Sequence, residues 1–317
     1  MKIVFLDAYT TNPGDISLSE ISALGELFCY DRTLEKQIVG RAKEADVVIT
    51  NKTSLSADTI KRLPKLKYIC VAATGFNIVD IAAARKYDVP VSNVKAYSTD
   101  SVAQLVFSHI LNLMIKIDKQ SESVKNGNWY KSSDFSYCNF PLFELTEMTI
   151  GIIGFGNIGR AVAQIANGFK MKINVYKPGE ILNKPEYVTQ TDKQTIFKNS
   201  DIITLHCPLV EETNIIINKE SLRIMKKTAY LINTGRGGLI NENELAEALN
   251  NKLIAGAGLD VLSEEPPRKN NPLIGAENCF VTPHVAWATV NARKRLVKGL
   301  TDNIKAYICG KPINVVN

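Results

Sequence analysis

The chain has 317 residues, of which 45% are hydrophobic and 22% are charged, and its formal net charge is +6. At about 150 residues per domain, this length predicts two globular domains with a sizeable core. No apolar run approaches the roughly 18 residues of a membrane helix, and the Lys and Arg residues form no basic block. We therefore expect neither a membrane span nor a nucleic-acid partner.

The amino terminus, MKIVFLDAYT, predicts a first strand rather than a signal peptide, because Asp7 interrupts its short apolar run. Six cysteines are scattered along the chain without a CxxC pair, so neither a metal site nor a dithiol motif is expected. The expected location is the cytoplasm, where such cysteines stay reduced.

Strand-like and helix-like runs alternate in the first part of the chain. Apolar runs predict strands at residues 2–6, 45–50, 66–72 and 89–93, with helices at 17–28 and 56–63. A longer helix is predicted from about residue 102 to 117, after an N-cap cluster at 98–100. His109 falls within its apolar pattern, which favours a packed histidine.

A polar segment then separates the two halves, and the second half has its own series of strands. We expect these at residues 149–154, 172–176, 201–207, 229–234, 253–261 and 279–282, with helices at 241–252 and 288–308. Strands that alternate with helices over most of a chain predict an α/β fold with parallel sheets.

The most specific motif is TIGIIGFGNIGRAVAQIA, in which a strand runs into Gly154, Gly156 and Gly159 and then into a helix. This spacing allows a tight turn, a close approach of backbone to a pyrophosphate, and close packing of helix on strand. The helix N-terminus then presents N–H groups to the phosphates. The motif predicts a dinucleotide site.

The residue after the second strand of this half is Lys177, where NAD sites usually place an acidic residue for the ribose 2′-hydroxyl. A cation here would attract the 2′-phosphate of NADPH. Alternatively, Lys177 is a solvated side chain, and Glu180 or a backbone group holds the ribose. The sequence leaves the choice between NAD and NADP open.

Three later motifs each follow a predicted strand. LINTGRGGLI carries Arg236, GLDVLSEEPP carries Asp260 and Glu265, and VTPHVAW carries His284. Ligands of open parallel sheets collect at the carboxyl ends of the strands. Together these motifs offer an anion clamp, an orienting carboxylate and a proton carrier.

With these motifs, the chain resembles the D-isomer-specific 2-hydroxyacid dehydrogenases over nearly its whole length, and within them the glycerate dehydrogenases (hydroxypyruvate reductases). The closest stretches include TNKTSLS, ATGFNIVDIAAARKYDVPVSNVKAYSTDSVAQ and TPHVAWAT. The resemblance implies two Rossmann-like, doubly wound parallel-sheet domains with a cleft between them. It assigns residues 1–99 plus 288–317 to a substrate domain and 100–287 to a dinucleotide-binding domain, and it implies a homodimer.

The resemblance also implies roles for matching residues. Arg236 would bind the substrate carboxylate, His284 would move the proton, and Glu265 would orient the imidazole of His284. The expected substrate-binding residues are Lys52, Thr74, Gly75, Arg236 and His284. The expected cofactor-binding residues are Gly154, Gly156, Asn157, Ile158, Gly159, Lys177, His206, Cys207, Pro208, Thr213, Thr234, Gly235, Asp260 and Ala286. Asp260 would hold the nicotinamide end, and His206, Cys207 and Pro208 would line the adenine pocket.

The resemblance further implies hydride transfer between a nicotinamide and a small 2-oxo or 2-hydroxy acid, first hydroxypyruvate and D-glycerate, then glyoxylate. The alternatives are a D-3-phosphoglycerate or D-lactate dehydrogenase. A different class also stays open, because some relatives are dinucleotide-sensing corepressors that bind protein partners and can retain the Arg, Glu and His. Turnover distinguishes these classes, since a sensor binds its dinucleotide tightly and turns over very slowly.

Overall fold

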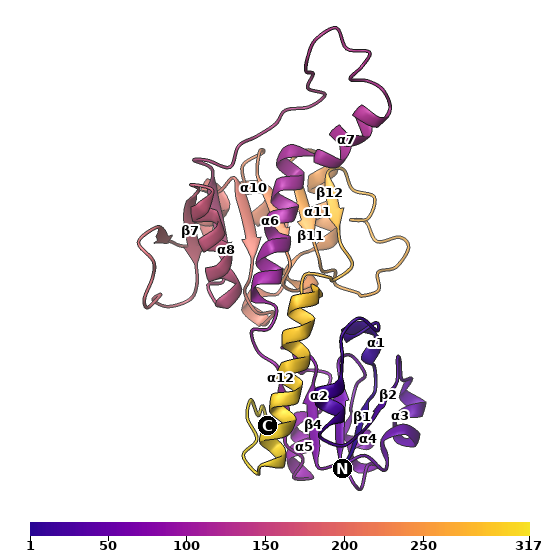
Figure 1. Cartoon of the computed structure of the whole chain (residues 1–317). Coiled ribbons are helices and arrows are strands. Elements are labelled where there is room, and N and C mark those ends of the chain that lie inside the picture. The colour runs from indigo at the N-terminus through magenta and orange to yellow at the C-terminus, as the bar shows by residue number, and fades with distance from the viewer. The chain divides into compact units, whose positions relative to one another are not determined.

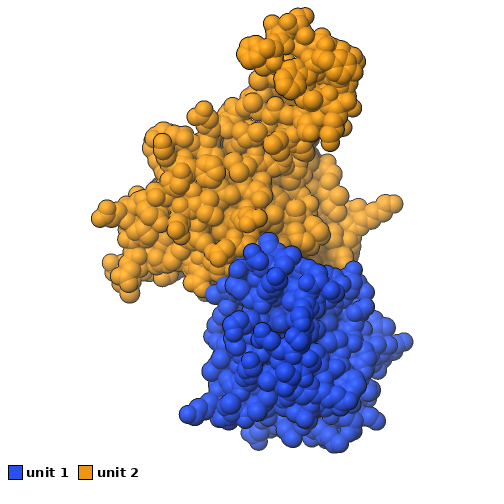
Figure 2. Space-filling model, viewed as in Figure 1, with its two compact units in different colours: residues 1–98, 287–317 blue, residues 99–286 orange.

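The computed structural model describes residues 1–317, which divide into two compact units (Figures 1 and 2). Unit 1 contains residues 1–98 and 287–317, and unit 2 contains residues 99–286. Each unit is built on one parallel sheet with helices on both faces, so the predicted α/β class is confirmed. None of the helices combines the length and apolar character needed to cross a bilayer.

Unit 1 has a five-stranded sheet in the order β2-β1-β3-β4-β5, which is a doubly wound order. Its central strands are short apolar runs with every residue buried, as expected for parallel strands covered on both faces. Its elements are β1 (Lys2–Phe5), α1 (Ala8–Thr11), α2 (Ser19–Ser22), β2 (Glu26–Cys29), α3 (Glu35–Ala42), β3 (Val47–Thr50), α4 (Ala57–Lys61), β4 (Tyr68–Val71), α5 (Ile81–Lys86), β5 (Val91–Asn93) and the C-terminal α12 (Val290–Ile308).

The C-terminal helix α12 belongs to the core of unit 1. The ring of Tyr307 stacks on that of Tyr68 in β4, with ring centroids 4.4 Å apart. The buried Asn303 donates a hydrogen bond from Nδ2 to the carbonyl oxygen of Asn93, at 2.9 Å. The last segment of the chain thus completes the fold that the first hundred residues begin.

The predicted helix at 17–28 is wrong in its second half. Residues 19–22 are helical, but Glu26–Cys29 form the edge strand β2, paired in parallel with β1. The chain turns at Gly25, where an added Cβ would lie 2.4 Å from the carbonyl oxygen of Met1. Glycine is a poor helix residue, and here it lets the chain pass close to the start of β1.

Unit 2 has a seven-stranded sheet in the order β12-β11-β10-β9-β6-β7-β8, the Rossmann order with one further strand. All its neighbouring strands are parallel. Its elements are α6 (Thr99–Ile115), α7 (Ile117–Lys125), β6 (Thr149–Ile153), α8 (Asn157–Gly168), β7 (Lys172–Tyr176), β8 (Val188–Gln190), α9 (Lys193–Asn199), β9 (Ile202–Leu205), α10 (Lys219–Ile224), β10 (Tyr230–Asn233), α11 (Glu242–Asn250), β11 (Gly256–Leu259) and β12 (Cys279–Val281), with 3-10 turns at Glu211–Thr213 and Gly237–Leu239.

Two apolar cores cover the two faces of this sheet. On one face, α6 and α8 lie side by side (Figure 1), and their buried residues pack with β6, β7 and each other. On the other face, α9, α10 and α11 form the second core with β9, β10 and β11. These layers hold the strand ends in place, and the candidate site lies at the carboxyl ends.

Candidate active site

The glycine motif connects β6 to α8 at the centre of the seven-stranded sheet. Gly154 has a φ of 96°, and a Cβ there would lie 2.5 Å from the backbone of His206. A Cβ on Gly159 would lie 2.3 Å from the carbonyl oxygen of Gly154. Gly154 therefore makes the tight turn, and Gly159 brings the helix against it, as the motif predicts.

The middle glycine faces free space. A Cβ on Gly156 would meet no atom within 4 Å, and this residue is the N-cap of the 12-residue helix α8, which begins at Asn157. A phosphate could approach the N–H groups of this helix end without meeting a side chain. At the end of β10, the buried hydroxyl of Thr234 has no hydrogen-bond partner. An open cradle and an orphaned buried polar atom fit a dinucleotide that binds across these strand ends.

His206 follows β9, next to the cradle. Its backbone N–H donates to the carbonyl oxygen of Ile153 at 2.7 Å, and its Nε2 lies 2.9 Å from the hydroxyl of Thr204. Desolvation lowers the pKa of His206 to about 3, so its ring is neutral at physiological pH. A neutral, part-buried ring suits a pocket wall rather than an acid catalyst. Nearby, the hydroxyl of Thr213 donates to the carbonyl oxygen of Pro208 at 2.6 Å, which closes the turn after Cys207.

Lys177 follows β7 on an exposed loop and forms no ion pair. Gln190 in β8 braces this loop, since its Nε2 donates to the carbonyl oxygen of Gly179 at 2.7 Å and its Oε1 accepts from the N–H of Ile181 at 3.1 Å. Glu180 is also exposed and without an ion-pair partner. The backbone is therefore held while the charge of Lys177 stays available.

His284 and Glu265 form a hydrogen-bonded pair at the carboxyl ends of β12 and β11. The Nδ1 of His284 lies 2.6 Å from Oε2 of Glu265, and their side chains are 30% and 35% exposed. The other oxygen, Oε1, accepts from the N–H of Leu262 at 3.1 Å. The carboxylate is thus fixed on one side and orients the imidazole on the other, which leaves Nε2 of His284 as the ring atom able to exchange a proton.

Asp260 is 1% exposed, and its oxygens bind the loop that carries His284. Oδ1 accepts from the hydroxyl of Thr282 at 2.6 Å and the N–H of Val285 at 2.9 Å, and Oδ2 accepts from the N–H of Ala286 at 2.8 Å. The N–H of His284 donates to the carbonyl oxygen of Asp260 at 2.9 Å. His284 has a φ of 53°, a left-handed conformation that is unfavourable for residues other than glycine unless the surroundings enforce it.

Arg236 is the third of the predicted catalytic residues, after Glu265 and His284. It is exposed, has no acidic partner, and donates from one guanidinium nitrogen to the carbonyl oxygen of Gly235 at 2.8 Å. A Cβ on the next residue, Gly237, would overlap the backbone of Leu262, at 1.9 Å. Only glycine permits this approach, which brings the loop of Arg236 against the loop of Glu265.

Sequence reasoning missed the buried Asn233, which shapes the Arg236 turn. Its Nδ2 donates to the carbonyl oxygen of Arg236 at 2.9 Å, and its Oδ1 accepts from the N–H of Gly235 at 3.0 Å. A polar residue at the buried end of a strand is the signal that could have identified it. Unit 2 therefore brings together Arg236, Glu265 and His284 with the glycine cradle at one sheet edge.

The three other predicted substrate residues, Lys52, Thr74 and Gly75, lie at strand ends in unit 1. The loop of Lys52 is held by Asp7, a buried residue that sequence reasoning did not assign to the site. Its Oδ1 accepts from the N–H of Asn51 at 2.8 Å, and its Oδ2 accepts from the N–H groups of Lys52 and Thr53, both at 2.6 Å. Asp7 lies just after β1, so the segment that follows one strand fixes the loop that follows the neighbouring strand β3.

The loop of Thr74 is braced in the same way. The Nδ2 of Asn93 donates to the carbonyl oxygen of Thr74 at 2.6 Å, and the hydroxyl of Thr74 donates to the carbonyl oxygen of Val94 at 3.1 Å. Both loops of unit 1 thus have ordered backbones, and Lys52 itself is exposed without an ion-pair partner.

Comparisons with known proteins identify the family of the chain. Residues 107–286 match the family model described as D-isomer specific 2-hydroxyacid dehydrogenase, NAD binding domain. A hydroxypyruvate reductase of Blautia hydrogenotrophica is 39% identical, with all of both chains aligned, and a glycerate dehydrogenase of Methylorubrum extorquens is 40% identical over 99% of this chain and 98% of its own. The solved structure of an acyclic imino acid reductase in complex with NADPH and D-Arg is 33% identical and superposes over both whole chains with a TM-score of 0.86. The cradle, the Glu265–His284 pair and this likeness over the full length lead to one conclusion: the chain belongs to the D-isomer-specific 2-hydroxyacid dehydrogenase family and is an oxidoreductase that uses a nicotinamide dinucleotide.

Proposed function

We propose that the protein reduces hydroxypyruvate to D-glycerate, with glyoxylate as a second substrate. The observation that carries this proposal is the 2.6 Å pair of Glu265 and His284 at the same sheet edge as the unpaired Arg236. The choice of substrate is supported by two full-length relatives, which are named as a hydroxypyruvate reductase and a glycerate dehydrogenase.

Arg236 binds the carboxylate of the 2-oxo acid. A guanidinium can donate two parallel, charge-assisted hydrogen bonds to a carboxylate, so one residue fixes both the position and the rotation of the substrate. Because Arg236 has no acidic partner in the protein, its charge is available for this contact. We also propose that Lys52, Thr74 and Gly75, which lie in unit 1, take part in substrate binding.

His284 donates a proton from Nε2 to the carbonyl oxygen during reduction and takes it back during oxidation. The bound dinucleotide supplies the hydride in reduction and accepts it in oxidation. Glu265 hydrogen-bonds Nδ1, which stabilises the charged imidazole that must exist before the proton is given. One proton and one hydride add across the C=O bond, and the product is a 2-hydroxy acid.

The cradle residues hold the dinucleotide. The N–H groups at Asn157, Ile158 and Gly159 would bind the pyrophosphate. The adenine side would be held by His206, Cys207, Pro208 and Thr213. The nicotinamide side would be held by Thr234, Gly235, Asp260 and Ala286. We further propose that Lys177 favours NADPH. NAD sites usually have an acidic residue at this position, which would repel the 2′-phosphate, whereas the unpaired cation of Lys177 on its braced loop would attract it.

The cofactor proposal is tested by measuring kcat/KM with NADH and NADPH for the native protein and for Lys177→Asp. We expect the native protein to prefer NADPH and the variant to prefer NADH, while Lys193→Asp, on the exposed first residue of α9, leaves the preference unchanged. A native preference for NADH would mean that Lys177 is a bystander.

The substrate proposal is tested by following oxidation of the reduced cofactor with hydroxypyruvate, glyoxylate, 3-phosphohydroxypyruvate and pyruvate. The glycerate formed is then resolved by chiral chromatography. We expect the highest kcat/KM with hydroxypyruvate and the D-isomer as product. A higher value with 3-phosphohydroxypyruvate or pyruvate would favour a phosphoglycerate or lactate dehydrogenase, and tight dinucleotide binding without turnover would favour a sensor.

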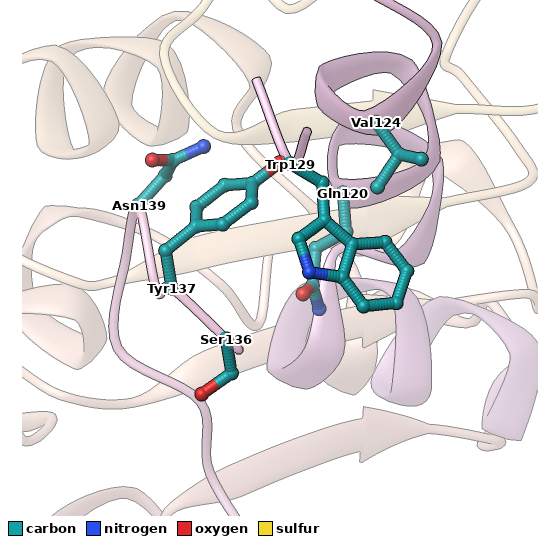
Figure 3. Close-up of a pocket in the computed structure, with 6 residues that line it drawn as sticks. All are labelled: Gln120, Val124, Trp129, Ser136, Tyr137 and Asn139. Carbon is teal, nitrogen blue, oxygen red and sulfur yellow. The ribbon is translucent and has the colours of Figure 1, made fainter. Parts of the chain in front are cut away.

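We propose that the protein is a homodimer that associates through an arm, defined here as residues 117–143, which projects from unit 2 (Figure 1). Trp129, Tyr130 and Phe135 of this arm are 53%, 82% and 91% exposed. Figure 3 shows a pocket in the arm that is lined by Gln120 and Val124 of α7 and by Trp129, Ser136, Tyr137 and Asn139. Aromatic side chains exposed together are typical of a surface that a partner covers. Analytical ultracentrifugation tests this proposal. We expect the native protein to sediment as a dimer and Phe135→Asp to form a dimer with a higher dissociation constant.

We propose a cytoplasmic location. The support is that all six cysteines are free thiols, as is usual in a reducing compartment. Fractionation of cells that express the protein would test this directly.

A further inference from the structure

His109 is a buried histidine that the proposed chemistry does not use. It lies on α6, is 4% exposed, and packs against β11 at Gly258. A Cβ on Gly258 would lie 2.7 Å from the Cβ of His109, so His109 can pack this closely against the strand only because residue 258 is a glycine. Desolvation lowers the pKa of His109, which keeps the ring neutral. A neutral imidazole has one N–H donor, and its partner identifies the tautomer.

The hydrogen bonds give that donor a direction. The Nε2 of His109 lies 3.2 Å from the hydroxyl oxygen of Thr282, and this hydroxyl lies 2.6 Å from Oδ1 of Asp260. A carboxylate only accepts, so Thr282 gives its single hydrogen to Asp260; its other acceptor, the carbonyl oxygen of Leu259, is farther away at 3.4 Å. Thr282 must then accept from His109, and the hydrogen of the imidazole is on Nε2.

This chain of hydrogen bonds ends on the backbone around His284. Asp260 accepts from the N–H groups of Val285 and Ala286, and its carbonyl oxygen accepts from the N–H of His284. These are the contacts that enforce the left-handed φ of 53° at His284. Because the hydroxyl of Thr282 accepts from His109 and donates to Asp260, it keeps the carboxylate of Asp260 in the rotation that reaches the amides of Val285 and Ala286.

We propose that His109 is a positioning residue, which donates from Nε2 to Thr282, locks the carboxylate of Asp260 and so fixes the imidazole of His284 for proton transfer. The inference rests on the proposed function, because it presumes that His284 is the proton donor. His109 itself touches neither substrate nor cofactor in this scheme.

The first test compares His109→Leu, which removes the donor, with His109→Gln, whose amide can replace it. We expect kcat for the best 2-oxo acid to fall about tenfold in the Leu variant, because small displacements of reacting groups are costly. The Gln variant should recover most of the loss. Leu113→Ala, one turn further along α6, serves as the packing control, since Leu113 packs near Gly256 in β11 and has no polar group that could take part in the His109–Thr282–Asp260 hydrogen bonds. It should lower the melting temperature and leave kcat close to the native value.

The second test is a double-mutant cycle with Thr282→Val. If His109 acts through the Thr282 hydroxyl, His109→Leu causes no further loss of kcat in the Thr282→Val background. The proposal is overturned if the two losses multiply, or if His109→Leu keeps native kcat. Should His109→Leu fail to fold, Thr282→Val must reproduce the tenfold loss by itself, and native kcat there would also overturn the proposal.

A readout without turnover separates this inference from the proposed function. Hydrogen exchange should show lower protection of the amides of Val285 and Ala286 in His109→Leu than in the native protein, with no such change in Leu113→Ala. Two-bond NMR correlations should find the hydrogen of His109 on Nε2. If the native protein reduces no 2-oxo acid, the proposed function fails, but these results still decide whether the His109–Thr282–Asp260 hydrogen bonds order the His284 loop. Equal amide protection in the native protein and in His109→Leu, or a hydrogen on Nδ1 of His109, would refute the positioning role of His109.

Discussion

The substitution Glu265→Gln tests the Glu265–His284 pair without changing the shape of either side chain. In the native protein Oε1 accepts from the N–H of Leu262, and Oε2 lies 2.6 Å from Nδ1 of His284. A glutamine keeps its carbonyl oxygen on Leu262, which places its NH2 group opposite His284. Two donors would then face each other whenever the imidazole is charged.

The size of the effect follows from this geometry. A hydrogen bond between two charged groups contributes about 1.5–3 kcal/mol, and the lower part of that range applies because both side chains are about a third exposed. A loss of about 2 kcal/mol in the transition state corresponds to a roughly 30-fold lower kcat/KM.

The assay is the steady-state reduction of hydroxypyruvate at one fixed pH, alongside a fluorescence titration with the dinucleotide. We expect kcat/KM to fall while the dissociation constant of the dinucleotide stays unchanged. The matched control is Glu264→Gln, because Glu264 is the adjacent acid and pairs only with Arg268 at the surface, at 2.7 Å. If Glu265→Gln reduced hydroxypyruvate as well as this control does, the orienting role of Glu265 would be wrong.

Three further predictions concern the cradle, the loop of unit 1 and acid stability. Gly156→Ala should fold with near-native stability but bind the dinucleotide weakly, since its Cβ enters the free space of the cradle. Gly159→Ala should instead lose about 2 kcal/mol in the free energy of unfolding, because its Cβ meets the backbone of Gly154. Melting curves and binding titrations of both variants distinguish the two effects. Asp7→Asn should raise KM for the 2-oxo acid about tenfold and leave dinucleotide affinity unchanged, because the amide NH2 cannot accept and at least one N–H of the 51–53 loop loses its acceptor. An unchanged KM would contradict the anchoring role. For His206 the folded pKa of about 3 is below the unfolded value of 6.5, so the unfolded state binds more protons at mildly acidic pH. The stabilisation that is present above pH 6.5 is therefore lost as the pH falls toward 3. In urea unfolding, the free energy of unfolding should drop between pH 7 and pH 5 by about 2 kcal/mol more in the native protein than in His206→Asn.

The sequence predicted much of the fold because parallel strands leave a local signature. Runs such as VVIT and YICV are almost entirely apolar and fully buried, since strands covered on both faces need no polar alternation. The elements that were missed are short or lie at an edge. Strand β2 was predicted as helix, and the three-residue β8 was not predicted at all. Short edge strands bury little apolar surface and are therefore weakly marked in the sequence.

The candidate site was predictable where motif and topology coincide. Arg236, Glu265 and His284 each follow a strand, and in a parallel sheet those ends meet at one edge. The residues that support them were not predictable, because their partners are far away in the chain. Asp7 binds amides more than forty residues later, with a separation of 44 for Asn51, and His109 is 173 residues from Thr282. Polar residues of this kind appear in the sequence only as interruptions of an apolar pattern.

The most direct test of the central claim is to compare His284→Ala with the native protein, measuring hydroxypyruvate reduction and dinucleotide affinity on the same samples. We expect the native protein to turn over, the variant to lose roughly a thousandfold or more in kcat, and both to bind the dinucleotide equally well. Near-native turnover in His284→Ala would contradict the claim that the Glu265–His284 pair moves the proton.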